Sequence, residues 1–111
     1  MSGVTSAARL RRDLDEDARR VTANRARCPR AVAIEALLFV ALDHERELPP
    51  EDQMPLPARG YLESIALDVS DAIRRGIEAS EHYQAEVIAF LHEHVRDPEV
   101  LMRKIAVRVG H

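Results

Sequence analysis

Three side chains suited to metal or proton chemistry recur every four residues in the second half of the chain: Glu78, His82 and Glu86. On an α-helix this spacing places two carboxylates and an imidazole on one face, and helical bundles build di-iron sites from such donors. Those sites also use a Glu-x-x-His pair, whereas the residue three before His82 is Ala79. At about 100° per residue the three side chains lie opposite the apolar stripe of the same helix. We therefore interpret them as a solvated face and predict no metal site.

The remaining histidines and the single cysteine show no shared chemistry. Residues two positions apart on a helix point about 200° from each other, so His92 and His94 cannot hold one ion together. His44 lies between two acids near the end of a predicted helix, where we expect it to complement the helix dipole as a cation at low pH. Cys28 precedes a predicted helix, but no histidine or acid can be named as its partner. We interpret it as a half-buried structural thiol.

The common sequence motifs of catalysis and cofactor binding are missing from the chain. It has no glycine-rich phosphate loop, no Gly-x-Ser-x-Gly, no His-Glu-x-x-His and no Cys-x-x-Cys. We predict that the protein is not an enzyme and binds no cofactor. One cysteine forms no internal disulfide, which is typical of a reducing cytoplasm. The longest apolar run covers only residues 36–42, whereas a membrane span needs about 20 residues, so we expect a cytoplasmic protein outside the membrane.

The composition favours helices, because Ala, Leu, Ile, Glu and Arg are frequent and the 111 residues include only four glycines. A first helix is predicted over residues 6–26, with Ser6 as its cap and opposite charges paired at i,i+4 along its surface. A second is predicted over residues 29–46, beginning at Pro29 and apolar on nearly every side, which indicates burial all round. The first helix carries a narrow apolar stripe, interrupted at one heptad position by Asp17: Ala7, Leu10, Leu14, Ala18 and Val21.

The second half of the chain is expected to begin with a loop and to end with a short helix. Four of the six prolines lie in residues 48–57, which predicts an extended connection. The last helix is predicted over residues 98–109, with Asp97 as its cap and Gly110 as its end.

Between these segments the sequence predicts one long amphipathic helix. No proline occurs between Arg59 and Asp97, and apolar or small residues recur there in steps of three and four. About 36 residues would span roughly 54 Å, whereas a compact domain of this size has a radius of gyration of about 13 Å. We expect the helix to bend near Gly76 or to project and be covered by a second chain. The predicted partner-binding residues are Ile65, Val69, Ile73, Gly76, Ile77, Ser80, Val87 and Leu91.

Charge is distributed unevenly along the chain. Residues 1–30 hold eight arginines against four acids, for about +4, and the remainder has a net charge of about −7. Residues 8–44, taken as a short strand at Arg9 followed by two helices, resemble the ribbon-helix-helix repressors, whose paired strands read the major groove. That resemblance implies DNA binding by an arginine-rich segment, although Leu10 and Leu14 fit helical spacing better. The nucleic-acid contacts of this alternative are Arg9, Arg11, Arg12, Arg19 and Arg20.

A second resemblance concerns residues 35–39 and the later proline loop, which are similar to small helical flagellar assembly regulators of the FlaF type. The chain departs from that pattern because it has no Trp and because the spacing between the two segments differs. We make no functional prediction from this resemblance.

These patterns together predict one all-α domain over residues 1–111, a bundle of three to four helices with one long helix and with helix 6–26 at its periphery. Gly76 and Ser80 allow either a tight contact within the chain or a close crossing of two copies. We expect a homodimer that acts as a non-enzymatic protein-binding module: an adaptor, a chaperone-like regulator or an inhibitor of a protein partner. The alternative is a DNA-binding regulator of ribbon-helix-helix or helix-turn-helix type.

Overall fold

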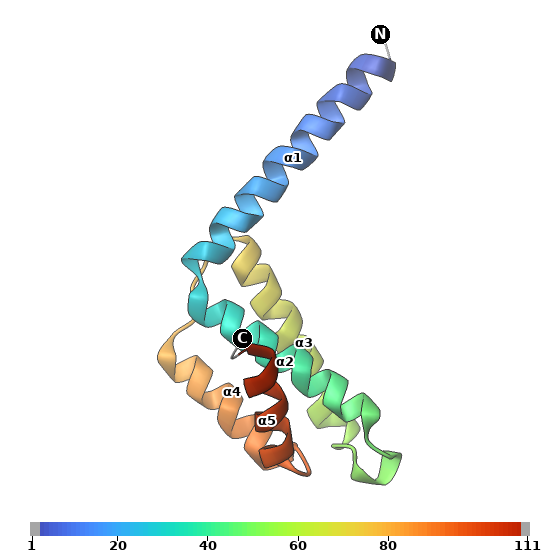
Figure 1. The fold of residues 1–111 in the computed structure, drawn as a ribbon, viewed down its shortest axis with the longest axis vertical. Coiled ribbons are helices and arrows are strands. Elements are labelled where there is room, and N and C mark those ends of the chain that lie inside the picture. The colour runs from blue at the N-terminus through green and yellow to red at the C-terminus, as the bar shows by residue number, and fades with distance from the viewer. Residues whose placement is uncertain (1–2, 110–111) are drawn as a thin grey trace.

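Five α-helices and no strand make up the part of the chain that the structure, a computed structural model, describes, which is residues 3–109 (Figure 1). The prediction of an all-α fold is confirmed, and the number of helices within these residues is higher than predicted. The helices are α1 (Gly3–Arg27), α2 (Pro29–Glu47), α3 (Leu56–Arg74), α4 (Glu81–His94) and α5 (Pro98–Val109), with a short 3-10 turn, η1 (Pro50–Asp52), between α2 and α3.

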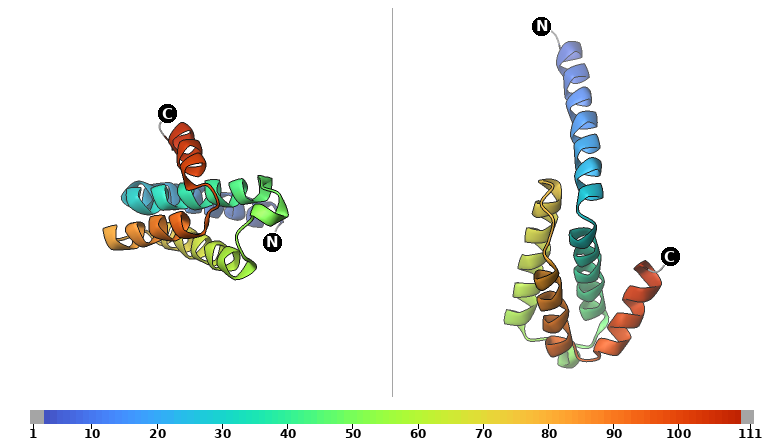
Figure 2. Two further views of the ribbon diagram at one scale, coloured as in Figure 1. Left: turned by 90° about the horizontal axis from the view of Figure 1, so that it is seen from below. Right: turned by 90° about the vertical axis from the view of Figure 1, so that its left-hand side faces the viewer.

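Helix α2 lies at the centre of the folded body and packs against α3, α4 and α5 (Figure 2). Its sequence is apolar on nearly every side, so it can bury residues against three neighbours at once. Phe39, on the same helix, is nevertheless 45% exposed, so the burial is not complete all round. The core is aliphatic, and its largest fully buried apolar side chains are Ile34, Leu38, Leu62, Ile73, Leu91 and Leu101.

Most predicted helix boundaries are close to the observed ones. The second helix begins at Pro29, as predicted, and the last begins at Pro98, where the carbonyl of Asp97 accepts the N–H of Leu101 at 3.3 Å. The predicted cap at Ser6 is wrong, because α1 already begins at Gly3. The predicted end at Gly110 lies outside the described residues.

The predicted single long helix is wrong, because two local signals interrupt it. Gly76 has φ of +74°, the left-handed conformation that glycine adopts most readily, and it closes α3. The N–H of Gly76 donates to the carbonyl of Ile73 at 3.0 Å, and the N–H of Ile77 donates to Ala72 at 2.9 Å. This is the paired pattern of a Schellman motif. Four residues later Ser80 starts α4, where its Oγ accepts the N–H of Tyr83 at 3.0 Å.

Helix α1 projects away from the body and gives the molecule its elongated shape (Figure 1). The principal extents are 59 × 30 × 27 Å, and the radius of gyration is 17.7 Å, against about 13 Å for a compact chain of similar length. In the part of α1 whose side chains the structure describes, the bonds to the body lie at the C-terminal end. There Asn24 Nδ2 donates to the carbonyl of Arg74 at 2.7 Å, and Arg25 pairs with Glu35 at 3.1 Å. The described side chains before Val21 are exposed.

Candidate functional site

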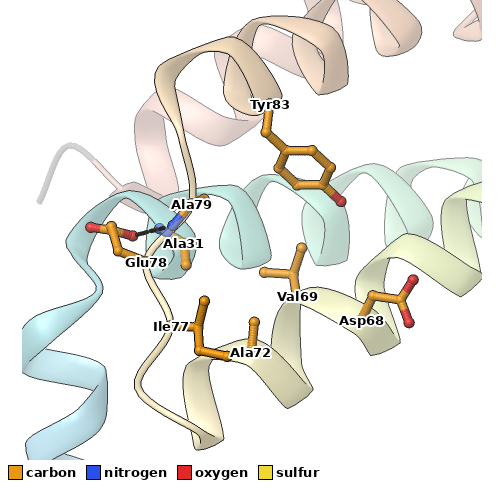
Figure 3. Close-up of a pocket in the computed structure, with 8 residues that line it drawn as sticks. All are labelled: Ala31, Asp68, Val69, Ala72, Ile77, Glu78, Ala79 and Tyr83. Carbon is orange, nitrogen blue, oxygen red and sulfur yellow. Dashed lines mark hydrogen bonds between the residues drawn. The ribbon is translucent and has the colours of Figure 1, made fainter.

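A groove runs between α3 and α4 over the surface of α2, and residues of all three helices line it. Its larger hollow has a volume of about 310 Å³ (Figure 3). It is lined by Ala31, Asp68, Val69, Ala72, Ile77, Glu78, Ala79 and Tyr83. The volume is at the lower end of the range for small-molecule sites, about 300–1,000 Å³, so it suits one or two apolar side chains of a partner.

The larger hollow exists because small side chains meet where three segments converge. Ala31 comes from the first turn of α2, Ala72 from the last turns of α3, and Ala79 from the loop that leads to α4. Val69 and Ile77 form aliphatic walls, and Figure 3 shows the ring of Tyr83 over the opposite side of the hollow. Ala72 is partly exposed, so leucine at this position would occupy the hollow, whereas Ala31 is 1% exposed and belongs to the core.

A smaller hollow of about 80 Å³ continues the groove toward the N-terminal end of α3. Tyr83 lines both hollows, so they are neighbours on the surface between α3 and α4. The rings of Tyr61 and Phe90 approach to 5.0 Å between centroids, and the ring of His94 lies 4.3 Å from that of Phe90. The residues that line the smaller hollow are Tyr61, Ile65, Tyr83, Glu86, Val87 and Phe90.

The charged residues that line the groove are all acids, namely Asp68, Glu78 and Glu86. Burial raises the pKa of Tyr83, and the nearby Tyr61, Asp68 and Glu86 raise it further, so its hydroxyl stays neutral and able to donate. The groove thus combines apolar hollows with a negative rim and one phenol donor.

Glu78 does not lie on a helix, contrary to the prediction that it shares a solvated helical face with His82 and Glu86. It lies in the loop before α4, where its Oε1 accepts the N–H of Ala31 at 2.8 Å and its Oε2 accepts the N–H of Arg30 at 3.0 Å. Glu78 therefore caps the N-terminus of α2 from a distant part of the chain. The residue at the N-cap position, Cys28, makes no capping hydrogen bond with its own side chain.

The cap also changes the acidity of Glu78. Desolvation alone would raise the pKa of the Glu78 carboxyl, but the backbone N–H groups of Arg30, Ala31 and Ala79 and the charge of Arg30 together hold it below its ordinary value. His82 and Glu86 remain paired at 2.6 Å on the exposed surface of α4. No group of three metal-ligating side chains occurs within the described residues.

The predicted partner-binding stripe is divided between the core and the groove. Ile73 and Leu91 are fully buried, so the structure moves them from the predicted interface into the core. Val69 and Ile77 line the larger hollow, and Ile65 and Val87 line the smaller one, although only Ile77 is exposed. Gly76 and Ser80 serve as helix-ending and helix-starting residues.

Nine of the residues that line the groove were not among the predicted partner-binding residues: Ala31, Tyr61, Asp68, Ala72, Glu78, Ala79, Tyr83, Glu86 and Phe90. A continuous helix over residues 59–97 would place the parts of α3 and α4 end to end, whereas the turn at Gly76 brings them side by side. The sequence does contain a signal for this turn. Gly76 can adopt the left-handed conformation that ends a helix, and Ser80, four residues later, can cap the start of the next one.

The five arginines of the nucleic-acid alternative are all exposed along α1. Residues 9–14 are helical, so the strand that the ribbon-helix-helix resemblance implied is absent from this segment. Arg20 pairs with Asp17 on the same helix, and acids at residues 13, 15 and 16 lie between the arginines.

The lowered pKa of His44 disfavours the cation that was predicted there at low pH, and Cys28 is buried more deeply than the predicted half-buried thiol. His44 is buried against α5, with its Nδ1 3.0 Å from Lys104 Nζ. Burial lowers the pKa of His44 and the adjacent ammonium of Lys104 lowers it further, so both act against the charged form of the ring. Lys104 also pairs with Glu47 at 3.0 Å. Cys28 is fully buried.

We compared the chain with protein-family models, with curated proteins and with solved structures, and none of them matches it. A search of the described helices for one long and apolar enough to cross a bilayer also found none.

Proposed function

We propose that this chain is a non-enzymatic helical protein-binding module, acting as an adaptor, a chaperone-like regulator or an inhibitor, and that its docking site is the α3–α4 groove. The observation that carries the proposal is a pair of neighbouring apolar hollows, both lined by Tyr83 and both flanked by acidic residues. Apolar grooves with a few placed polar groups are the usual receptors of amphipathic helices.

The spacing of the hollows matches a helical ligand. Ile65 in the smaller hollow and Ala72 in the larger one are seven residues apart on α3, which corresponds to about 10 Å. A partner helix that presents apolar anchors at i and i+7 has the same spacing. The rim acids Asp68 and Glu86 favour Arg or Lys beside those anchors, so the proposed ligand is a basic amphipathic helix.

Selection of helical peptides against the immobilised protein tests this proposal. We expect enrichment of peptides with apolar anchors at i and i+7 flanked by Arg or Lys. Ala72→Leu, which fills the larger hollow, and Asp68→Arg, which reverses the rim charge, should each weaken peptide binding at least about tenfold. Leu67→Ala, at a side chain that is 73% exposed, should leave binding unchanged. Lack of enrichment, or binding that both groove variants leave intact, contradicts the proposal.

The alternative is a DNA-binding regulator, for which the exposed arginines of α1 are the supporting observation. Because acids at residues 13, 15, 16 and 17 interrupt them, we expect duplex DNA to bind only in the non-specific range of about 10⁻⁴ to 10⁻⁶ M at physiological salt. Fluorescence anisotropy across salt concentrations measures this. Nanomolar, sequence-dependent binding that Arg9→Ala and Arg11→Ala abolish would favour the alternative.

We also propose that the chain is a homodimer in the cytoplasm. The exposed leucines of α1 support the dimer, and the single buried Cys28 suits a reducing compartment. Light scattering at micromolar concentration should report about twice the chain mass of 12.5 kDa. A mass of one chain at every concentration contradicts the dimer without bearing on the groove.

A further inference from the structure

We propose that α5 docks on α2 in a pH-dependent manner: it stays docked while the ring of His44 is neutral, and it detaches when that ring is protonated. The inference goes beyond the proposed function and does not depend on it. Figure 2 shows α5 on the opposite side of α2 from α3, so the contact that would open is separate from the α3–α4 groove.

Helix α5 is held to the body by few groups. It packs mainly against α2, and among its described side chains only Leu101 is buried. A hollow of about 210 Å³ lies between the two helices and is lined by residues of both: Val40, Asp43, His44, Glu47, Lys104 and Arg108. Local opening in proteins begins at elements with few buried contacts, and a last helix with one buried anchor is such an element.

The ring of His44 lies in the contact between α2 and α5. It is 3% exposed, and its Nδ1 lies 3.0 Å from Lys104 Nζ. Because an ammonium group can only donate, Nδ1 is the acceptor of this hydrogen bond, and the proton of the neutral ring is then on Nε2. Nε2 is itself buried and has no hydrogen-bond partner among the described residues. The docked site therefore fits the neutral ring in one tautomer.

Protonation of the ring removes this fit. The added proton would be on Nδ1 and would face the Lys104 ammonium across 3.0 Å, so a hydrogen bond becomes a contact between two donors of like charge. The imidazolium would also be shielded from water, with its Nε2–H unpaired. Detachment of α5 relieves both penalties, because it exposes the ring to water and separates it from Lys104. It would also uncover the face of α2 that carries Val40.

The charged groups around His44 come from all three segments that surround it: Asp43, Glu45 and Glu47 of α2, Asp97 of the connection before α5, and Lys104 and Arg108 of α5. Arg108 lies 4.0 Å from Asp43, so these two charges are paired. Desolvation disfavours the imidazolium most and Lys104 adds to this effect, whereas the remaining acids favour the imidazolium. The balance lowers the pKa of His44 from its ordinary value of 6.5 in the docked state.

The sign of the pH dependence follows from this balance. When α5 is detached the ring is solvated, so it takes up a proton more readily than in the docked state. Docking is therefore strongest above the ordinary value of 6.5 and weakens as the pH falls from there toward the lowered pKa of His44. This window lies above the range in which free carboxyl groups titrate, about pH 4, so a histidine is the group that responds in it.

Hydrogen exchange of the full chain, measured by mass spectrometry at about pH 7.5 and about pH 5.5, tests the inference. After correction for the intrinsic exchange rate, the protection of α5 should be about threefold lower at the acidic pH, and that of α3 should be unchanged. His44→Gln, which introduces a polar side chain that does not titrate, should remove the pH dependence. His92→Gln, at an exposed site of α4, should retain it. Circular dichroism checks that each variant is folded.

A second variant tests the part assigned to the ammonium. Lys104→Met removes the charge beside His44 and keeps a chain of similar length, so the pH dependence of α5 protection should become smaller without vanishing. Three results overturn the inference: α5 of the wild type is unprotected at both pH values, its protection is independent of pH, or His44→Gln responds to pH as the wild type does. An unchanged response in Lys104→Met contradicts the role of Lys104.

Discussion

Helices α1 and α2 follow one another in the chain with only Cys28 between them, yet they are held in opposite ways. Helix α2 buries residues against three neighbouring helices, whereas the described side chains of α1 are exposed for most of its length. Helix α1 is rich in charged pairs at helical spacing, such as Arg20 with Asp17. Ion pairs within the helix and helix propensity account for the helical conformation of α1. The position of α2, in contrast, is fixed by packing against its neighbours.

The two helices also differ in how their ends are satisfied. The N-terminus of α2 has no capping side chain of its own and is capped by Glu78 from the loop before α4. The C-terminal end of α1 is held by Asn24, whose amide bonds to the end of α3. Both hydrogen-bond partners, Glu78 and the carbonyl of Arg74, belong to the segment around Gly76. The turn that separates α3 from α4 therefore also fixes the ends of α1 and α2.

Truncation of a leucine in each helix provides the sharpest test of this difference. Leu38→Ala in α2 removes a fully buried side chain and should cost about 2–5 kcal/mol in unfolding free energy. Leu14→Ala in α1, at a side chain that is 61% exposed, should change it by less than about 0.5 kcal/mol at a concentration low enough to keep the chain monomeric. Urea denaturation measures both. Equal costs would mean that α1 is packed in the monomer.

A pair of glycine substitutions probes the joint between the two halves. Gly76→Ala should cost about 1–2 kcal/mol, because its φ of +74° strains an L-residue and the added methyl would lie 3.0 Å from Asn24 Oδ1. Gly60→Ala, within α3, meets no atom within 4 Å and should stabilise the protein by about 0.5–1 kcal/mol. Thermal unfolding of the two variants should therefore shift in opposite directions. A neutral Gly76→Ala would contradict the role assigned to the turn.

The smallest expected effect comes from the distant cap of α2. Glu78→Gln should lower stability at neutral pH, because the lowered pKa of Glu78 means that its carboxylate is bound better in the folded state. That contribution is complete above the ordinary pKa of about 4.5 and is lost as the pH falls through the lowered value. Denaturation as a function of pH should show the wild-type and variant curves converging on acidification. Glu63→Gln, at an exposed site, serves as the control.

Several elements of this fold were predictable because their signals are local. Pro29 and Pro98 mark helix starts by their fixed φ, and the apolar character of residues 31–42 indicates a central buried helix. The helix over 59–97 was mispredicted because its periodicity continues across Gly76. Glycine is tolerated inside a helix at a modest cost, so its presence alone does not reveal whether the chain turns.

The candidate site was predictable only in part, for a related reason. Val69 and Ile77 belong to the predicted partner-binding stripe and do line the groove, whereas Tyr83 and Phe90 were missed. Their place in the groove depends on α4 folding back along α3, a consequence of the turn at Gly76. Glu78 was predicted to lie on a solvated helical face, whereas the fold places its carboxylate at the N-terminus of α2.

By itself, the amino-acid sequence determined the helical class, the buried character of α2 and the charged surface of α1, because periodicity, propensity and capping act over a few residues. Only the tertiary structure decided that α3 and α4 are separate helices that lie side by side, that Glu78 caps α2, and that Leu10 and Leu14 remain uncovered. These features depend on contacts between residues far apart in the chain, and such contacts follow from how whole helices pack rather than from any local pattern.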